Sequence, residues 1–147
     1  MIEIGGEVYC KGKNPKGEKW HIGIDKPGDD PANENNDLQT ILAITDVGMA
    51  TSGNYRQYYY LNGKKYAHTI DPRSGFPINH NLLSATVIAQ TCMQADAYAT
   101  AFMVLGVKRS LEICKADPNV ECYLISSSSN GNLKIDYSPG FEKYFSK

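Results

Sequence analysis

Residues 83–106 read LSATVIAQTCMQADAYATAFMVLG, which joins a strand pattern directly to a helix pattern. The first part, Leu83–Gln90, is rich in β-branched and apolar side chains, and this predicts a buried strand. Thr91 follows as a candidate helix N-cap, with Gln94 placed to complete a capping box, and Gly106 stands where a helix would close. The stretch therefore predicts a central strand followed at once by a buried helix.

The predicted helix contains an unusual pair of polar residues. Almost all side chains of Cys92–Leu105 are apolar or aromatic, which is typical of a helix buried on every side. Asp96 and Thr100 are four residues apart and so lie one turn apart on one face. A carboxylate in an apolar site needs a metal ion, a Lys or Arg partner, or the favourable field of the helix start. One carboxylate plus a hydroxyl suits Mg²⁺, which completes its shell with water and phosphate oxygens. Residue types alone leave the magnesium site and the ion pair both open.

The rest of the chain contains more strand patterns than helix patterns, and the two do not alternate. This predicts an α+β fold with a mixed or antiparallel sheet, and the length predicts a single domain over residues 1–147. The expected strands cover residues 2–10, 18–25, 38–45, 55–61, 64–70, 121–126 and 133–137, with further helices at 108–115 and 141–145. The glycine-bracketed segment 47–53, taken alone, predicts a tight turn.

Composition excludes two classes of protein. The 15 basic and 16 acidic residues give a net charge of −1. The chain therefore lacks the excess of basic residues that is typical of nucleic-acid-binding proteins. The longest apolar runs, such as residues 99–106, are far shorter than the roughly 20 residues of a membrane-spanning helix. Residues 1–10 show no secretory signal pattern.

A second candidate site is the loop HTIDPRSGFP at residues 68–77. His68 titrates near neutrality and can accept a hydroxyl proton, and Arg73 can bind a phosphate group through two hydrogen bonds. The alternatives are a hydrogen-bonded strand histidine and a turn ion pair between Arg73 and Asp71.

Taken in order, these segments resemble the C-terminal half of the ApbE family, the FAD:protein FMN transferases. The matching pieces are IGGE at 4–7, WHIGI at 20–24, ATSG at 50–53, HTIDPRSG at 68–75, SATVIA at 84–89, ADAYATA at 95–101 and VLG at 104–106. The most specific is the HxIDPR[ST]G loop followed about 20 residues later by ADAxxT. The resemblance implies an ApbE-like, T-fold-like architecture. Nothing here corresponds to the N-terminal half of the family pattern, which supplies much of the FAD pocket.

The resemblance also implies roles for individual residues. Asp96 and Thr100 match helix ligands for Mg²⁺, Ile70 matches a flavin-contacting position, and His68 matches the proposed base. Arg73 remains either a phosphate contact or a brace within its loop.

The family transfers FMN from FAD to a Ser or Thr hydroxyl of a target flavoprotein and releases AMP. Its acceptors are subunits of the sodium-pumping NADH:quinone reductase and Rnf complexes, and its members are usually periplasmic or cell-envelope lipoproteins. Two other functions stay open: an FAD pyrophosphatase giving FMN and AMP, and a non-catalytic scaffold lacking the FAD pocket. A third alternative also stays open, in which the chain works only with a separate N-terminal polypeptide or as a homo-oligomer.

Overall fold

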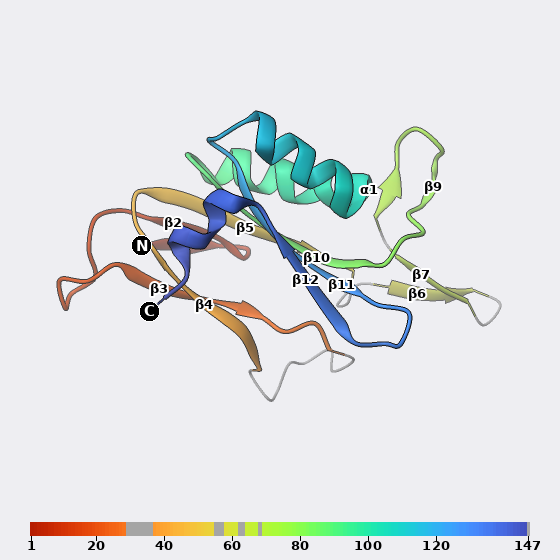
Figure 1. The fold of residues 1–147 in the computed structure, drawn as a ribbon, viewed down its shortest axis with the longest axis horizontal. Coiled ribbons are helices and arrows are strands. Elements are labelled where there is room, and N and C mark those ends of the chain that lie inside the picture. Colours follow the sequence, from red (N-terminus) through yellow and green to blue (C-terminus); the bar gives the residue numbers. More distant parts are fainter. Residues whose placement is uncertain (29–36, 55–57, 62–63, 68, 147) are drawn as a thin grey trace.

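Six strands of the described chain form one antiparallel sheet in the order β1-β2-β5-β10-β11-β12 (Figure 1). The computed structural model describes residues 1–28, 37–54, 58–61, 64–67 and 69–146. The sheet strands are β1 (Ile2–Ile4), β2 (Glu7–Cys10), β5 (Val47–Gly53), β10 (Leu82–Ala89), β11 (Glu121–Ser127) and β12 (Leu133–Tyr137). The predicted α+β fold with an antiparallel sheet is confirmed, and β10 is one of its two central strands.

The remaining elements lie outside this sheet. Three separate hairpins are formed by β3 (Trp20–Asp25) with β4 (Leu38–Ile44), β6 (Tyr58–Leu61) with β7 (Lys64–Ala67), and β8 (Ile70–Asp71) with β9 (Phe76–Pro77). The helices are α1 (Cys92–Ala116) and a 3₁₀-helix, η1 (Pro139–Tyr144). The helix expected near the C-terminus is therefore present, as a 3₁₀-helix that starts at a proline.

The two faces of the sheet carry different coverings, because successive side chains in a strand point to opposite faces. Ala85, Val87 and Ala89 of β10 pack against α1, which lies over one face (Figure 1). Ile88 points the other way and packs with the β3–β4 hairpin and with Phe141 of η1. The sheet is thus the middle layer, and the face each residue occupies follows from its place in the strand.

Helix α1 begins as the sequence predicts, directly against the sheet. The hydroxyl of Thr91 accepts a hydrogen bond from the Gln94 backbone N–H at 3.2 Å. A Cβ on Gly48 of β5 would lie 2.4 Å from the Cys92 nitrogen, so only glycine permits this approach of strand and helix. No helix in the described part of the chain is long and apolar enough to cross a membrane.

The predicted stop at Gly106 is present as a sharp kink. Gly106 has φ 76° and ψ 174°, outside the helical region, and the helix resumes beyond it through Ala116. The two helices expected from the sequence are therefore two arms of α1.

Three predictions about local structure were wrong. Residues 2–10 form two strands, because Gly5 and Gly6 have positive φ and turn the chain back on itself. The segment expected as a tight turn is the strand β5, whose glycines allow the close packing of α1. Helix α1 is buried on one face only: Ala95, Ala99 and Phe102 are buried, whereas Asp96 and Thr100 are exposed.

Candidate active site

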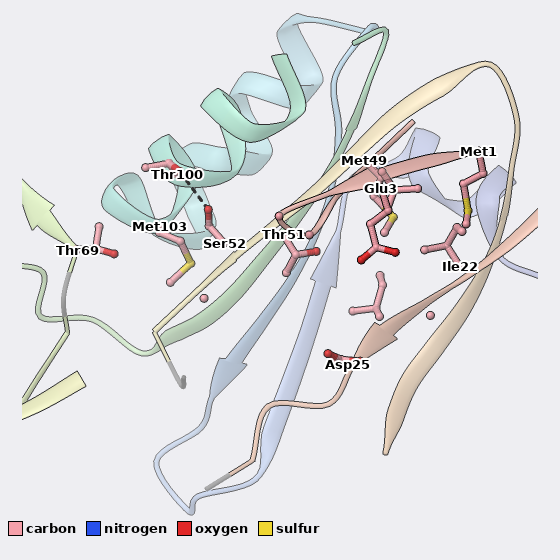
Figure 2. Close-up of a pocket in the computed structure, with 16 residues that line it drawn as sticks. Met1, Glu3, Ile22, Asp25, Met49, Thr51, Ser52, Thr69, Thr100 and Met103 are labelled. Atoms are coloured by element: carbon pink, nitrogen blue, oxygen red, sulfur yellow. Dashed lines mark hydrogen bonds between the residues drawn. The ribbon is translucent and has the colours of Figure 1, made fainter. Parts of the chain in front are cut away.

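A cavity of about 570 Å³ lies between the N-terminal hairpin, β3, β5 and α1 (Figure 2). The described residues that line it are Met1, Glu3, Gly5, Gly6, Val8, Ile22, Gly23, Ile24, Asp25, Met49, Thr51, Ser52, Gly53, Thr69, Thr100 and Met103. Hydroxyl groups gather at the α1 end, while Glu3 and Asp25 lie at the β3 end. The cavity therefore has an end rich in neutral oxygen donors and an end that carries carboxylates.

Two hydrogen bonds organise the hydroxyl end. The Ser52 and Thr100 hydroxyls lie 3.1 Å apart and join β5 to α1 (Figure 2). The Thr69 hydroxyl donates to the Asn54 side-chain oxygen at 2.9 Å, joining the end of β5 to the loop that precedes β8. The end of β5 thus contacts both segments that the sequence singles out for chemistry.

Asp96 lies one helical turn before Thr100, exposed and outside the cavity lining. Its carboxylate forms no hydrogen bond or ion pair with any residue that the structure describes. The first turn of α1 contains no acidic residue, and the favourable field of a helix start falls off within that turn. Neither structural alternative for Asp96 is therefore found among the described residues. The expectation of a buried carboxylate was wrong, because the Asp96 side chain is exposed.

The loop at residues 69–77 is braced internally. The Arg73 guanidinium donates to the Asp71 carboxylate from Nε at 2.9 Å and from Nη2 at 2.8 Å. These bonds and the Arg73 backbone N–H lower the pKa of Asp71 to about 2. Of the two alternatives for Arg73, the turn ion pair is the one found here. The Ile70 side chain is 46% exposed, and neither it nor Arg73 lines the cavity. His68 lies outside the described residues.

The donor set at the hydroxyl end fits Mg²⁺. Asp96 offers a carboxylate without a described partner, and Thr100 offers a hydroxyl oxygen that the Ser52 hydroxyl contacts. Mg²⁺ prefers oxygen ligands and is commonly held by one or two carboxylates, with water and substrate phosphates filling its shell. Among the described residues, no group of three or more His, Cys, Asp or Glu side chains could hold a metal by itself. Any cation here would therefore share its coordination with a ligand and with water.

The charged groups that line the cavity also favour a bound cation. Its described lining contains the carboxylates of Glu3 and Asp25 and neither Lys nor Arg. A diphosphate bound there would lie near the Glu3 carboxylate, and an accompanying cation would offset that repulsion.

Sequence reasoning assigned no role to several lining residues. Ser52 and Thr69 stand inside quoted motifs, and their hydroxyls were the available signal. Glu3 and Asp25 gave no signal, because their meeting in one cavity depends on how separate hairpins pack.

Comparisons with known proteins agree with this architecture. The model of the ApbE family matches residues 1–124. The FAD:protein FMN transferase of Haemophilus influenzae is 44% identical over 131 residues, which is 89% of this chain and 37% of the relative. The FAD:protein FMN transferase of Salmonella typhimurium is 38% identical over 98% of this chain and 39% of its own length. The chain thus spans about two-fifths of these relatives.

Solved structures give the same result. The flavin transferase ApbE from Vibrio cholerae superposes with a TM-score of 0.80 at 37% identity, covering 97% of this chain and 43% of that one. The apo flavinyl transferase ApbE of Pseudomonas stutzeri gives 0.78 at 32% identity, covering 97% and 42%. With the family model matching most of its residues, the chain belongs to the ApbE family.

Proposed function

We propose that this chain carries the magnesium helix and the catalytic loop of an enzyme that transfers FMN from FAD to a Ser or Thr hydroxyl of a protein and releases AMP. Family membership and relatives named FAD:protein FMN transferase support the FAD and FMN part of this proposal. Magnesium, the hydroxyl acceptor and AMP release are inferred from the residues. The observation that carries the proposal is the meeting of Thr100, Ser52 and Thr69 in one cavity, one helical turn from the exposed Asp96, whose carboxylate has no ion-pair partner among the described residues.

In this mechanism Asp96 and Thr100 would hold Mg²⁺ beside the diphosphate of FAD. The ion, when bound, supplies the positive charge that offsets negative charge on the diphosphate oxygens. The acceptor hydroxyl oxygen forms a bond to the FMN phosphorus while the bond from that phosphorus to the bridging oxygen breaks. The bridging oxygen leaves with AMP, and His68 takes the hydroxyl proton as general base. These steps assign no role to Arg73, whose guanidinium binds Asp71.

Replacement of Asp96 tests the proposal. The full gene product is incubated with FAD, MgCl₂ and a flavoprotein subunit that offers a Ser or Thr acceptor, and covalent flavin is followed by in-gel fluorescence and intact mass. Asp96→Ala is expected to abolish transfer and to leave the thermal melting midpoint near the wild-type value, because the side chain is exposed and makes no described contact. Glu112→Ala is the matched control, since Glu112 is an exposed acidic residue of the same helix that pairs with Arg109.

Three results would contradict the proposal. Transfer by Asp96→Ala at the wild-type rate in magnesium buffer would remove Asp96 from the mechanism. Release of free FMN and AMP with no modified protein would assign the FAD pyrophosphatase reaction instead. Absence of both reactions and of FAD binding would assign a non-catalytic scaffold.

We further propose acceptor subunits of the sodium-pumping NADH:quinone reductase or Rnf type, and a location at the cell envelope. Both proposals follow from the family resemblance. Flavin labelling of a purified Rnf-type subunit, and fractionation of cells producing the full gene product, test them.

A further inference from the structure

The end of β5 connects two parts of the cavity that come from distant segments of the chain. Ser52 contacts Thr100 on α1 at 3.1 Å, and Asn54 accepts a hydrogen bond from Thr69 at 2.9 Å. Ser52, Thr69 and Thr100 all line the same cavity. Two side chains separated by one residue therefore reach the proposed metal helix and the proposed catalytic loop.

The end of β5 is itself firmly held. Ser52 pairs with Ala85 of β10, which is fully buried, and Gly53 pairs with Ser84. The Asn54 backbone N–H donates to the Leu83 carbonyl at 2.9 Å. Side chains built on such a strand hold their positions more accurately than side chains on a free loop.

The loop at residues 69–77, by contrast, depends on few connections. Its two short strands pair with each other and not with the main sheet. The Asp71–Arg73 ion pair and the Ile78 N–H bond to the Thr69 carbonyl at 3.1 Å stiffen it internally. Among hydrogen bonds between described residues, the one from Thr69 to Asn54 is the side-chain link that joins this loop to the sheet. Because the loop is stiff, this link influences the placement of all of it.

We propose that Ser52 and Asn54 are positioning residues that set the spacing between the Asp96–Thr100 face of α1 and the loop that begins at Thr69. Ser52 orients the Thr100 hydroxyl, and Asn54 fixes Thr69, the residue next to His68 in the chain. The inference rests on the proposed function and adds to it the two residues, Ser52 and Asn54, that keep the reacting groups at the right distance from each other. Its physical basis is that reacting groups displaced by about 1 Å can lose on the order of 100-fold in rate.

Variants at Asn54 and Thr69 test the link to the loop in the full gene product. Asn54→Ala and Thr69→Val remove the acceptor and the donor, and each is expected to lower kcat for FMN transfer by about 10- to 100-fold with KM for FAD unchanged. Asn54→Asp and Thr69→Ser keep an acceptor oxygen and a donor hydroxyl, and each should restore kcat. The double variant Asn54→Ala/Thr69→Val should have the same kcat as either single variant, because each substitution removes the same hydrogen bond.

Binding of magnesium tests the link to α1 without relying on activity. Ser52→Ala is expected to weaken Mg²⁺ binding, titrated calorimetrically in the presence of FAD, by about 10-fold, as for other groups that orient a metal ligand. Ser52→Thr keeps the hydroxyl and should bind as the wild type does. Asn130→Ala is the matched control for both tests, because it breaks a serine–asparagine side-chain bond in the β11–β12 loop, outside the cavity lining.

The outcomes separate this inference from the proposed function. Wild-type kcat in Asn54→Ala and Thr69→Val, together with wild-type Mg²⁺ affinity in Ser52→Ala, would overturn the inference while loss of transfer in Asp96→Ala left the function standing. Absence of transfer by the wild-type protein would overturn both. If kcat falls in Asn54→Ala and Thr69→Val and the conservative variants do not restore it, Asn54 and Thr69 have a role in folding only. That result would also overturn the inference.

Discussion

Asp71 and Arg73 form the ion pair that braces the loop at residues 69–77. The guanidinium makes two roughly parallel bonds to the carboxylate, an arrangement that is stronger than a single neutral hydrogen bond. Arg73 is 69% exposed on its other side, so the pair is screened by water. Its main consequence is to shape the loop and to keep Asp71 ionised.

Arg73→Gln should raise the pKa of Asp71 from about 2 toward the ordinary value near 3.9. The rise should be incomplete, because the backbone N–H of residue 73 still donates to the carboxylate. The folded pKa lies below the unfolded one, so this group stabilises the protein above about pH 4 and loses that effect as pH falls toward 2. Carboxyl-carbon NMR titration measures the change, with Arg109→Gln as the control. An Asp71 pKa that stays near 2 in Arg73→Gln would show that the ion pair is not its cause.

Single residues stood out in the sequence where polar groups interrupted an apolar pattern or where opposite charges lay close together. Asp96 and Thr100 stood out as polar positions on an apolar helix, and Arg73 and Asp71 as close opposite charges. Ser52 and Asn54 could not be selected in this way, because their partners Thr100 and Thr69 are 48 and 15 residues away. Such contacts depend on the packing of α1 and of the loop against β5.

At the scale of elements, α1 and β5 define the fold through their close contact. Gly48 lies beneath the first residue of α1, and a methyl group there would fall 2.4 Å from backbone atoms of residues 91 and 92. Backbone atoms cannot rotate away as side chains do, so strand and helix would have to separate.

Gly48→Ala should therefore lower the free energy of unfolding by about 1–3 kcal/mol, the usual range for overpacking, or more. Gly28→Ala is the control, because nothing lies within 4 Å of its Cβ position and its φ is not in the left-handed region. Urea denaturation followed by circular dichroism measures both. Equal stability of the two variants would refute the close-contact interpretation.

The kink of α1 gives a second prediction of a different kind. A Cβ at Gly106 has room, with the His80 ring no nearer than 3.8 Å, but φ 76° and ψ 174° form a conformation that is essentially restricted to glycine. Gly106→Ala should cost about 1–3 kcal/mol of unfolding free energy through backbone strain alone. Asn adopts the left-handed helical conformation more readily than most residues, but that conformation has a much smaller ψ than the 174° of Gly106. Gly106→Asn should therefore be destabilised as well. Wild-type denaturation midpoints for both variants would contradict the strain argument.

Elements with strong local signals were predicted well. The strand before α1, its threonine cap and the break in the helix at Gly106 follow from residues within one short stretch. Strand β5 was missed because glycines usually mark turns, and its glycines serve the contact with α1 instead. The exposure of one face of α1 was missed because alanine and methionine there look like core residues, although apolar side chains are common on protein surfaces.

At the scale of the whole molecule, the order of the sheet brings the site together. β2 pairs with β5 and β5 with β10, so segments near residues 8, 50 and 86 become neighbours. No local pattern specifies these pairings, and the cavity formed with β3 could not be derived before them. The chain also spans only 37–39% of the length of the relatives compared above.

The central claim is that a divalent cation on the Asp96–Thr100 face of α1 makes FMN transfer from FAD feasible. The most direct measurement is covalent flavin on the acceptor, determined by intact mass, after incubation of the full gene product with FAD in EDTA and again after excess Mg²⁺ is added. The account predicts no modified acceptor in EDTA, recovery with Mg²⁺, and no recovery in Thr100→Val, which keeps the shape of the side chain and removes its oxygen. Transfer that proceeds equally in EDTA, or that Thr100→Val performs at the wild-type rate, would contradict it.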